Sequence, residues 1–283
     1  MTEKQFVEVL DAEMAYTETG EGRPIVFLHG NPTSSFLWRK VIPELDGLGR
    51  CIAPDLIGMG DSEKVEGEYR FVDHRRYLDA FLDALGVSEE VTLVVHDWGG
   101  GLGFDWANRH RPAVRAIAYM ETIVMPVEWS DWPEGSRGIF EAMRGEAGET
   151  IILEKNVFVE RILPASVLEP LPAAVHDEYR RPYLDGGESR RPTLTWPRQI
   201  PIGGEPADVS VIVSDYSEWL SRSDVPKLFV NADPGSILVG RQREFCRSWP
   251  NQQEVTVAGT HFIQEDSGPE IGRAVASFLR GLD

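Results

Sequence analysis

The sequence is short of cysteine, of basic residues and of long apolar stretches, and each shortage excludes a class of protein. Its two cysteines, Cys51 and Cys246, cannot form a disulfide framework, and neither lies in a CxxC motif. Lys and Arg number 28 against 46 Asp and Glu, so the net charge is −18. Because such a surface repels phosphate backbones and anionic lipids, we expect no nucleic-acid partner and no membrane partner.

Two targeting features are also missing. No stretch of about 18 apolar residues is present, so no transmembrane helix is expected. The N-terminal segment lacks the basic residues and following apolar run that mark a secretory signal. Hydrophobic residues make up 42% and charged residues 26% of the chain, as in ordinary globular proteins. We therefore expect a cytoplasmic protein, with a monomer as the simplest oligomeric state.

Strand and helix patterns alternate along much of the chain. The N-terminal third predicts a hairpin from residues 6–10 and 14–17, then buried strands at 24–28 and 50–54 and an amphipathic helix at 74–85. Such alternation is typical of a parallel, doubly wound sheet with helices on its faces. Later apolar runs continue the pattern with four strands and a closing helix, at 91–95, 116–120, 227–230, 254–257 and 271–279.

The middle of the chain differs from both flanks. Residues 126–211 contain no clear strand pattern, many prolines and amphipathic helical patches that carry aromatic side chains. We interpret this segment as a helical cap inserted into a core that residues 1–125 and 212–283 form together. In open α/β sheets, ligands bind beyond the carboxyl ends of the strands, where the cap would sit.

One strand-to-helix junction carries a candidate nucleophile. The run Val95-His96-Asp97-Trp98-Gly99 follows the strand at 91–95, and the sharp turn that it predicts is typical of a nucleophile elbow. Aspartate stands where a serine esterase has serine, and Val95 replaces the first glycine of the G-x-S-x-G pattern. A carboxylate suits attack on saturated carbon, which forms an alkyl ester that water must then hydrolyse. A helix N-cap is the alternative role of Asp97.

Hydrolysis of such an ester requires a base, and His261 is the candidate. It follows the strand at 254–257, and in this order of elements the base comes last along the chain. General-base catalysis accelerates the attack of water by roughly 10²–10⁴-fold. We expect two other histidines to pack around the site and three to be exposed: His29 and His96 in the first group, and His74, His110 and His176 in the second.

The base needs a carboxylate that orients it and stabilises its charged form. Glu121 ends the strand at 116–120, and Asp233 ends the strand at 227–230. The residues alone leave these two candidates equal. The anion displaced from carbon needs hydrogen-bond donors, which Asn31 and Trp98 can supply from their side chains. Their backbone N–H groups are candidates for the oxyanion hole, and packing under the cap is the alternative role of Trp98.

These residues lie in motifs that resemble those of the haloalkane dehalogenases, with the closest likeness to the second subfamily. The resemblance extends over nearly the whole chain, including the cap. It rests on six stretches: Phe27-Leu28-His29-Gly30-Asn31-Pro32-Thr33-Ser34-Ser35, Asp55-Leu56-Ile57-Gly58-Met59-Gly60-Asp61-Ser62, Val94-Val95-His96-Asp97-Trp98-Gly99, Tyr119-Met120-Glu121, Arg191-Pro192-Thr193-Leu194-Thr195-Trp196-Pro197-Arg198 and His261-Phe262-Ile263-Gln264-Glu265-Asp266.

The resemblance implies a fold, a reaction and a set of roles. The fold is the α/β-hydrolase fold, a mostly parallel eight-stranded sheet flanked by helices with an inserted helical cap. The reaction converts a small halogenated alkane and water to alcohol, halide ion and a proton, without a metal or other cofactor. Asp97 is implied as nucleophile, His261 as base and Glu121 as acid, with Asn31 and Trp98 as halide ligands. Five further residues are implied to line the pocket or its tunnel: Ile139, Phe140, Phe158, Ile237 and Leu238.

Three other functions are compatible with parts of this pattern. Epoxide hydrolases share the aspartate and histidine but need acidic cap hydroxyls, for which Tyr179, Tyr183 and Tyr216 are candidates. Coelenterazine-type luciferases share the same triad and cap motif. A non-enzymatic receptor or interaction module on this scaffold tolerates loss of triad members, whereas this chain has all of them.

Overall fold

A single mixed sheet organises the chain, of which the computed structural model describes residues 3–282. The strand order is β1-β2-β4-β3-β5-β6-β7-β8. The N-terminal strands form the predicted hairpin and pair antiparallel, and all pairs from β4 to β8 are parallel. The prediction of a mostly parallel eight-stranded sheet is therefore confirmed. The strands are β1 (Gln5–Val9), β2 (Ala12–Thr19), β3 (Pro24–Leu28), β4 (Arg50–Pro54), β5 (Val91–Asp97), β6 (Val114–Thr122), β7 (Lys227–Pro234) and β8 (Gln252–Gly259).

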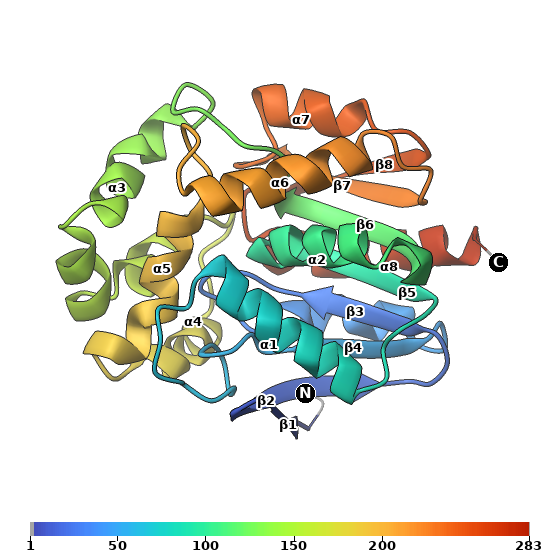
Figure 1. The fold of residues 1–283 in the computed structure, drawn as a ribbon, viewed down its shortest axis with the longest axis horizontal. Helices are drawn as coiled ribbons and strands as arrows, with labels where there is room; N and C mark the ends of the chain where they lie inside the picture. The colour runs from blue at the N-terminus through green and yellow to red at the C-terminus, as the bar shows by residue number, and fades with distance from the viewer. Residues whose placement is uncertain (1–2, 283) are drawn as a thin grey trace.

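Helices cover both faces of this sheet, as Figure 1 shows. Alternate side chains of β3 point to opposite layers, so Val26 and Leu28 join one apolar cluster while Ile25 and Phe27 join the other. Every residue of β5 is buried, as expected for a central parallel strand. The first cluster lies under α1 (Phe71–Ala84), α2 (Trp98–Arg109), α6 (Ala207–Leu220) and α7 (Gly240–Arg247), and the second under α8 (Ile263–Arg280).

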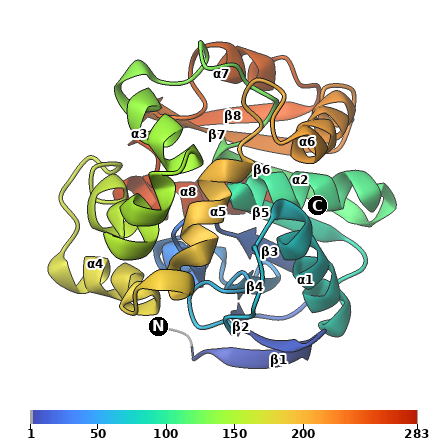
Figure 2. The same cartoon turned by 60° about the vertical axis from the view of Figure 1, so that its left-hand side comes forward.

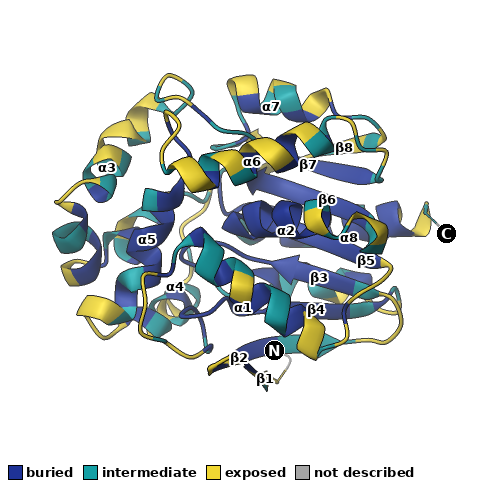
Figure 3. Ribbon diagram, in the orientation of Figure 1, coloured by how far each residue is buried: buried dark blue, intermediate teal, exposed yellow. Residues whose placement is uncertain are grey.

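The segment between β6 and β7 is helical and gathers at one end of the sheet, visible in Figure 2. It has a small apolar cluster of its own, to which Met143, Ile152, Phe158 and Leu194 contribute, and its outer surface is largely exposed (Figure 3). Because α6 runs across the 211/212 boundary, we propose that the cap joins the core near residue 206. The cap elements are α3 (Glu134–Arg144), two π-helical segments (Glu149–Glu154 and Phe158–Ile162), α4 (Ala173–Arg180) and α5 (Arg191–Gln199).

No helix within residues 3–282 combines the length and the apolar character needed to cross a bilayer. Both cysteines are buried and free, and burial raises the pKa of Cys51 to about 12. They are therefore packed as small apolar groups.

The histidine predictions need one correction. His29 and His96 are buried, and His110 and His176 are partly exposed, but His74 is 1% exposed rather than solvated. Its ring stacks on Trp196 at 4.2 Å between centroids. His74 precedes the apolar positions of α1 at helical spacing, so it shares their buried face. Burial lowers the pKa of His74 to about 3, and that of His29 to about 4.

Because some histidines are buried in their neutral form, we expect the folded protein to lose stability in acid. The unfolded chain protonates its histidines near pH 6.5, while folded His74 stays neutral, so the unfolded state binds more protons and stability falls as the pH drops below 6.5. His74→Phe preserves a stacking ring and removes the proton site. The free energy of unfolding should fall from pH 7 to pH 5 in both proteins. The fall should be about 2 kcal/mol smaller in the variant than in the wild type. Urea unfolding at both pH values measures this difference, and equal losses would contradict it.

Candidate active site

Asp97 lies at the junction of β5 and α2, in a backbone conformation that few side chains adopt. Its φ of 50° and ψ of −128° turn the chain sharply between strand and helix. The hydroxyl of Thr122 donates to the Asp97 carbonyl at 2.6 Å. A Cβ atom at Gly100 would lie 1.7 Å from that hydroxyl oxygen, so only glycine fits there. The predicted elbow is therefore present and projects the Asp97 carboxylate beyond the end of the sheet.

Two backbone N–H groups hold the Asp97 carboxylate. The N–H of Asn31 donates to Oδ2 at 2.7 Å, and the N–H of Trp98 also donates to this carboxylate. Asp97 is 6% exposed, and its burial raises the pKa of the carboxyl group, while His261 and the two N–H groups oppose that rise. Oδ2 thus occupies a site that favours negative charge, and Oδ1 is the oxygen nearer to His261.

His261 lies between two carboxylates. Its Nε2 is 3.8 Å from Asp97 Oδ1, and its Nδ1 is 3.7 Å from Glu121 Oε2. His96 fixes the backbone of His261, because its Nε2 donates to the His261 carbonyl at 2.8 Å. Burial and the neighbouring His261 lower the pKa of His96 well below its ordinary value, so His96 is neutral. The arrangement suits His261 for accepting a proton on the Asp97 side while Glu121 stabilises the charge that the ring gains.

Glu121 is the carboxylate beside the histidine. It follows Met120 near the end of β6, is fully buried, and accepts the N–H groups of Ser236 at 3.0 Å, Ile237 at 2.7 Å and Leu238 at 3.3 Å. Asp233, the other candidate from the residues, is exposed near the end of β7. The geometry therefore favours Glu121 as the group that orients His261.

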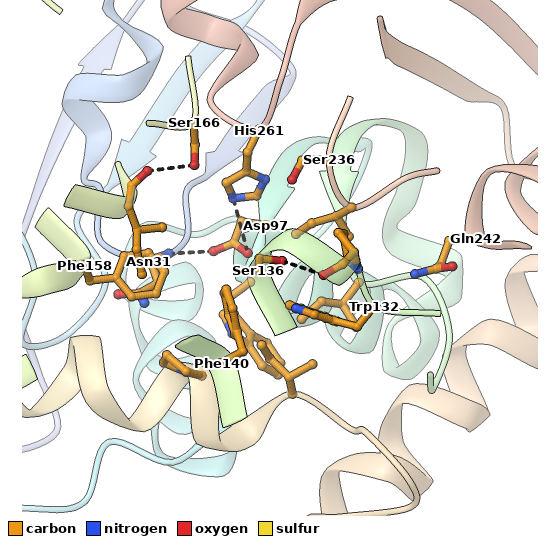
Figure 4. Close-up of a pocket in the computed structure, with 17 residues that line it drawn as sticks. Asn31, Asp97, Trp132, Ser136, Phe140, Phe158, Ser166, Ser236, Gln242 and His261 are labelled. Atoms are coloured by element: carbon orange, nitrogen blue, oxygen red, sulfur yellow. Dashed lines mark hydrogen bonds and ion pairs between the residues drawn. The ribbon is translucent and has the colours of Figure 1, made fainter. Parts of the chain in front are cut away.

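A cavity of about 110 Å³ opens above Asp97, between the core and the cap. Figure 4 shows Asp97 and His261 at its centre, with Asn31 and Phe158 on one side and Trp132 and Gln242 on the other. The wall is mostly apolar, and it contains no Lys or Arg among the described residues. Seven predicted site residues line it: Asn31, Asp97, Trp98, Phe140, Phe158, Ile237 and His261.

Two predicted pocket residues lie elsewhere. Ile139 and Phe140 both pack against the cap's own apolar cluster, but only Phe140 also lines the cavity, because neighbouring side chains on α3 point about 100° apart. Leu238 is fully buried in the main core cluster, while its neighbour Ile237 faces the cavity. Ile139 and Leu238 are therefore not among the residues that line this cavity, and their place in the pocket or its tunnel stays a prediction.

The cavity wall also includes residues that the sequence reading did not select. The spacing of 158, 162 and 166 repeats every four residues, so extending the pattern from Phe158 would have found Ile162 and Ser166. Ser136 is likewise four residues before Phe140 on α3. For Gln242, no signal in the sequence pointed to the site. The unselected lining residues are Ile123, Trp132, Pro133, Ser136, Ile162, Ser166, Pro197, Ile200, Ser236 and Gln242.

A stack of rings supports the Trp98 side chain. Its ring lies 4.7 Å from that of Trp196 at an interplanar angle of 25°, and Trp196 stacks in turn on His74. The Nε1 of Trp196 donates to Met59 Sδ at 3.4 Å. Trp98 is thus held by packing on one side and borders the cavity on the other. In the described part of the chain, no group of three or more His, Cys, Asp or Glu is arranged to hold a metal ion.

Comparisons with known proteins agree on one family. A family model described as the alpha/beta hydrolase fold matches residues 23–268. A haloalkane dehalogenase from Sphingobium indicum is 58% identical, covering 99% of this chain and 96% of its own. One from Mycolicibacterium smegmatis is 52% identical, covering 98% and 91%. The crystal structure of a haloalkane dehalogenase from Bradyrhizobium elkani superposes with a TM-score of 0.95 at 41% identity, covering 99% and 98%.

The hydrogen bonds to Glu121 predict that replacing Glu121 lowers the free energy of unfolding more than replacing Asp233 does. Glu121→Gln places an amide NH₂ among three backbone donors, and an unpaired buried donor costs about 1–3 kcal/mol. Asp233→Asn alters an exposed side chain, for which a change within about 0.5 kcal/mol is typical. Urea unfolding at neutral pH compares the two variants. Equal destabilisation would show that the contacts of Glu121 do not matter for folding.

Proposed function

The chain belongs to the haloalkane dehalogenases within the α/β-hydrolase fold family, and on that premise we propose that Asp97 cleaves carbon–halogen bonds by direct displacement. The observation that carries this proposal is the elbow carboxylate, which accepts two backbone N–H groups, with Oδ2 bound to the Asn31 N–H and Oδ1 on the side of His261. Burial removes most of the water that would otherwise shield the nucleophile. Oδ1 bonds to the carbon, the halogen departs with the bonding electrons, and Asp97 becomes an alkyl ester.

The departing halide would bind to side-chain donors. Trp98 carries an indole N–H and Asn31 an amide NH₂, and both residues border the cavity beside Asp97. Neutral donors stabilise an anion that forms in an apolar cavity, and they do not form an ion pair with Asp97 as a lysine or arginine would. The halide can therefore be released after each turnover.

The ester would then be hydrolysed by a water molecule that His261 deprotonates. Water attacks Cγ of Asp97, and negative charge develops on Oδ2, to which the Asn31 N–H already donates; the Trp98 N–H also donates to this carboxylate. Glu121, 3.7 Å from Nδ1, stabilises the imidazolium that His261 becomes. The ester bond breaks to release the alcohol and restore the carboxylate. The overall reaction consumes one water and produces an alcohol, a halide ion and a proton.

The cavity argues against two alternative reactions. Tyr179, Tyr183 and Tyr216 are not among its lining residues, so they are not placed to protonate an epoxide. Tyr179 instead donates to Glu265 at 2.6 Å, and Tyr216 to the carbonyl of Ile123 at 2.6 Å. A volume of about 110 Å³ also suits a short alkane better than the large aromatic substrate of a luciferase.

Separating the two steps tests the proposed mechanism. His261→Gln removes the base, so the first displacement should occur while hydrolysis of the ester slows by about 10²–10⁴-fold. Mixed with 1-bromobutane, this variant should release about one equivalent of bromide per enzyme and then stop. Mass spectrometry should find a butyl group on the peptide that contains Asp97.

Asp97→Asn is the matched control, because it keeps the size of the side chain and removes the nucleophile. It should give no bromide burst and no butylated peptide. Continuous turnover by Asp97→Asn, or a burst from His261→Gln without alkylation of Asp97, would refute the covalent mechanism.

A further inference from the structure

The loop that carries His261 contacts a segment of the cap. This segment, residues 166–169, lies between the second π-helical segment and α4. The N–H of Phe262, directly after His261, donates to the carbonyl of Ser166 at 3.0 Å. Ser166 and His261 also line the same cavity, as Figure 4 shows. The cap therefore binds the backbone on the C-terminal side of the proposed base.

Asp266 forms a second link between the cap segment and this loop. It lies in the first turn of α8, and its Oδ1 accepts the N–H of Leu168 at 2.9 Å. The N–H of Glu169 also donates to this carboxylate. Oδ2 accepts the N–H of Thr260, directly before His261, at 3.3 Å. One carboxylate thus joins the cap to the backbone on the N-terminal side of the base.

The position of the His261 ring matters for the proposed hydrolysis. Its Nε2 and Nδ1 lie 3.8 and 3.7 Å from the carboxylates of Asp97 and Glu121, beyond the roughly 3.2 Å limit of an N–H···O hydrogen bond. Nδ1 is buried and makes no hydrogen bond within residues 3–282. A small displacement of the ring therefore decides whether the bond to Glu121 forms. The backbone on either side of His261 sets that displacement.

We infer that Asp266 is a positioning residue for hydrolysis of the ester. Through the Thr260 N–H it holds the His261 ring within reach of the attacking water and of Glu121. The inference rests on the proposed function, because it assumes an alkyl ester on Asp97. Displacement of the halide needs the Asp97 carboxylate and the halide donors, and no hydrogen bond in the described chain joins these groups to Asp266. Loss of the Asp266 carboxylate therefore slows the second step and not the first.

Asp266→Asn tests this role. An amide keeps one acceptor oxygen, and its NH₂ meets the N–H groups that bound the other oxygen. Single-turnover rapid-quench reactions with 1-bromobutane measure both steps, because bromide release follows displacement and loss of the butyl group from the Asp97 peptide follows hydrolysis. Hydrolysis should slow by about tenfold to a hundredfold, while displacement stays within about twofold of the wild type.

Steady-state kinetics should show the same selectivity. At low bromide concentration, kcat/KM depends only on the steps up to halide displacement, so Asp266→Asn should leave it unchanged. Once hydrolysis limits turnover, kcat and KM should fall by the same factor. A general structural defect would instead lower kcat/KM, because it reduces the fraction of active enzyme.

Tyr179→Phe is the matched control, because it breaks a different link between the cap and α8. The Tyr179 hydroxyl donates to Glu265 at 2.6 Å, and the Glu265 carboxylate binds Arg39 on the side away from the base. Both single-turnover rate constants should be unchanged in Tyr179→Phe. Asp266→Ser removes the carboxylate from a partly exposed position and should reproduce the selective slowing. Urea unfolding checks that each variant is folded.

Unchanged hydrolysis in both variants of Asp266, an equal slowing of both steps, or a comparable slowing in Tyr179→Phe would overturn the inference. Failure of both Asp266 variants to fold would show a structural role and would overturn it as well. Absence of a butylated peptide from the wild type and from His261→Gln would instead count against the proposed function.

Discussion

The contact between the Asp97 carboxylate and the backbone at the end of β3 is the constraint on which the rest of the site depends. The Asn31 N–H reaches Oδ2 at 2.7 Å only because Gly30 has no side chain: a Cβ there would lie 2.2 Å from that oxygen. Two neighbouring parallel strands, β3 and β5, thereby bring a turn and an elbow within hydrogen-bonding distance. The same contact that fixes the carboxylate in the resting enzyme would stabilise the charge that develops during ester hydrolysis.

The segment after β7 connects Glu121, the proposed acid, to the cavity beside Asp97. Three successive N–H groups, from Ser236 to Leu238, donate to Glu121, and these bonds compensate the burial of its carboxylate. Ser236 and Ile237 also line the cavity. The position of Glu121 and the shape of the cavity wall are therefore linked through one short segment. A side chain on this segment can affect substrate choice and the orientation of His261 together.

Features that follow from local sequence patterns could be predicted, whereas features that depend on tertiary packing could not. Strand alternation, the elbow and the helical cap follow from periodicity and turn residues, and the structure confirms the sheet and places Asp97, His261 and Asn31 together. The choice between Glu121 and Asp233 could not be made from the residues, because both follow strand ends and only packing buries one of them. His74 was wrongly expected to be exposed because its polar character outweighed its position on an apolar helix face. Gln242 was missed because nothing near it in sequence indicates that α7 borders the cavity.

The origin of the oxygen atom in the product tests the central claim most directly. The test is a single turnover in water enriched in oxygen-18, with enzyme in excess over 1-bromobutane. In the proposed mechanism, Asp97 attacks the carbon and water attacks the carboxyl carbon of the ester. The alcohol should therefore carry unlabelled oxygen from Asp97, and the peptide that contains Asp97 should gain oxygen-18. Labelled alcohol with an unlabelled Asp97 peptide would mean that water attacks the substrate directly, and it would contradict the account.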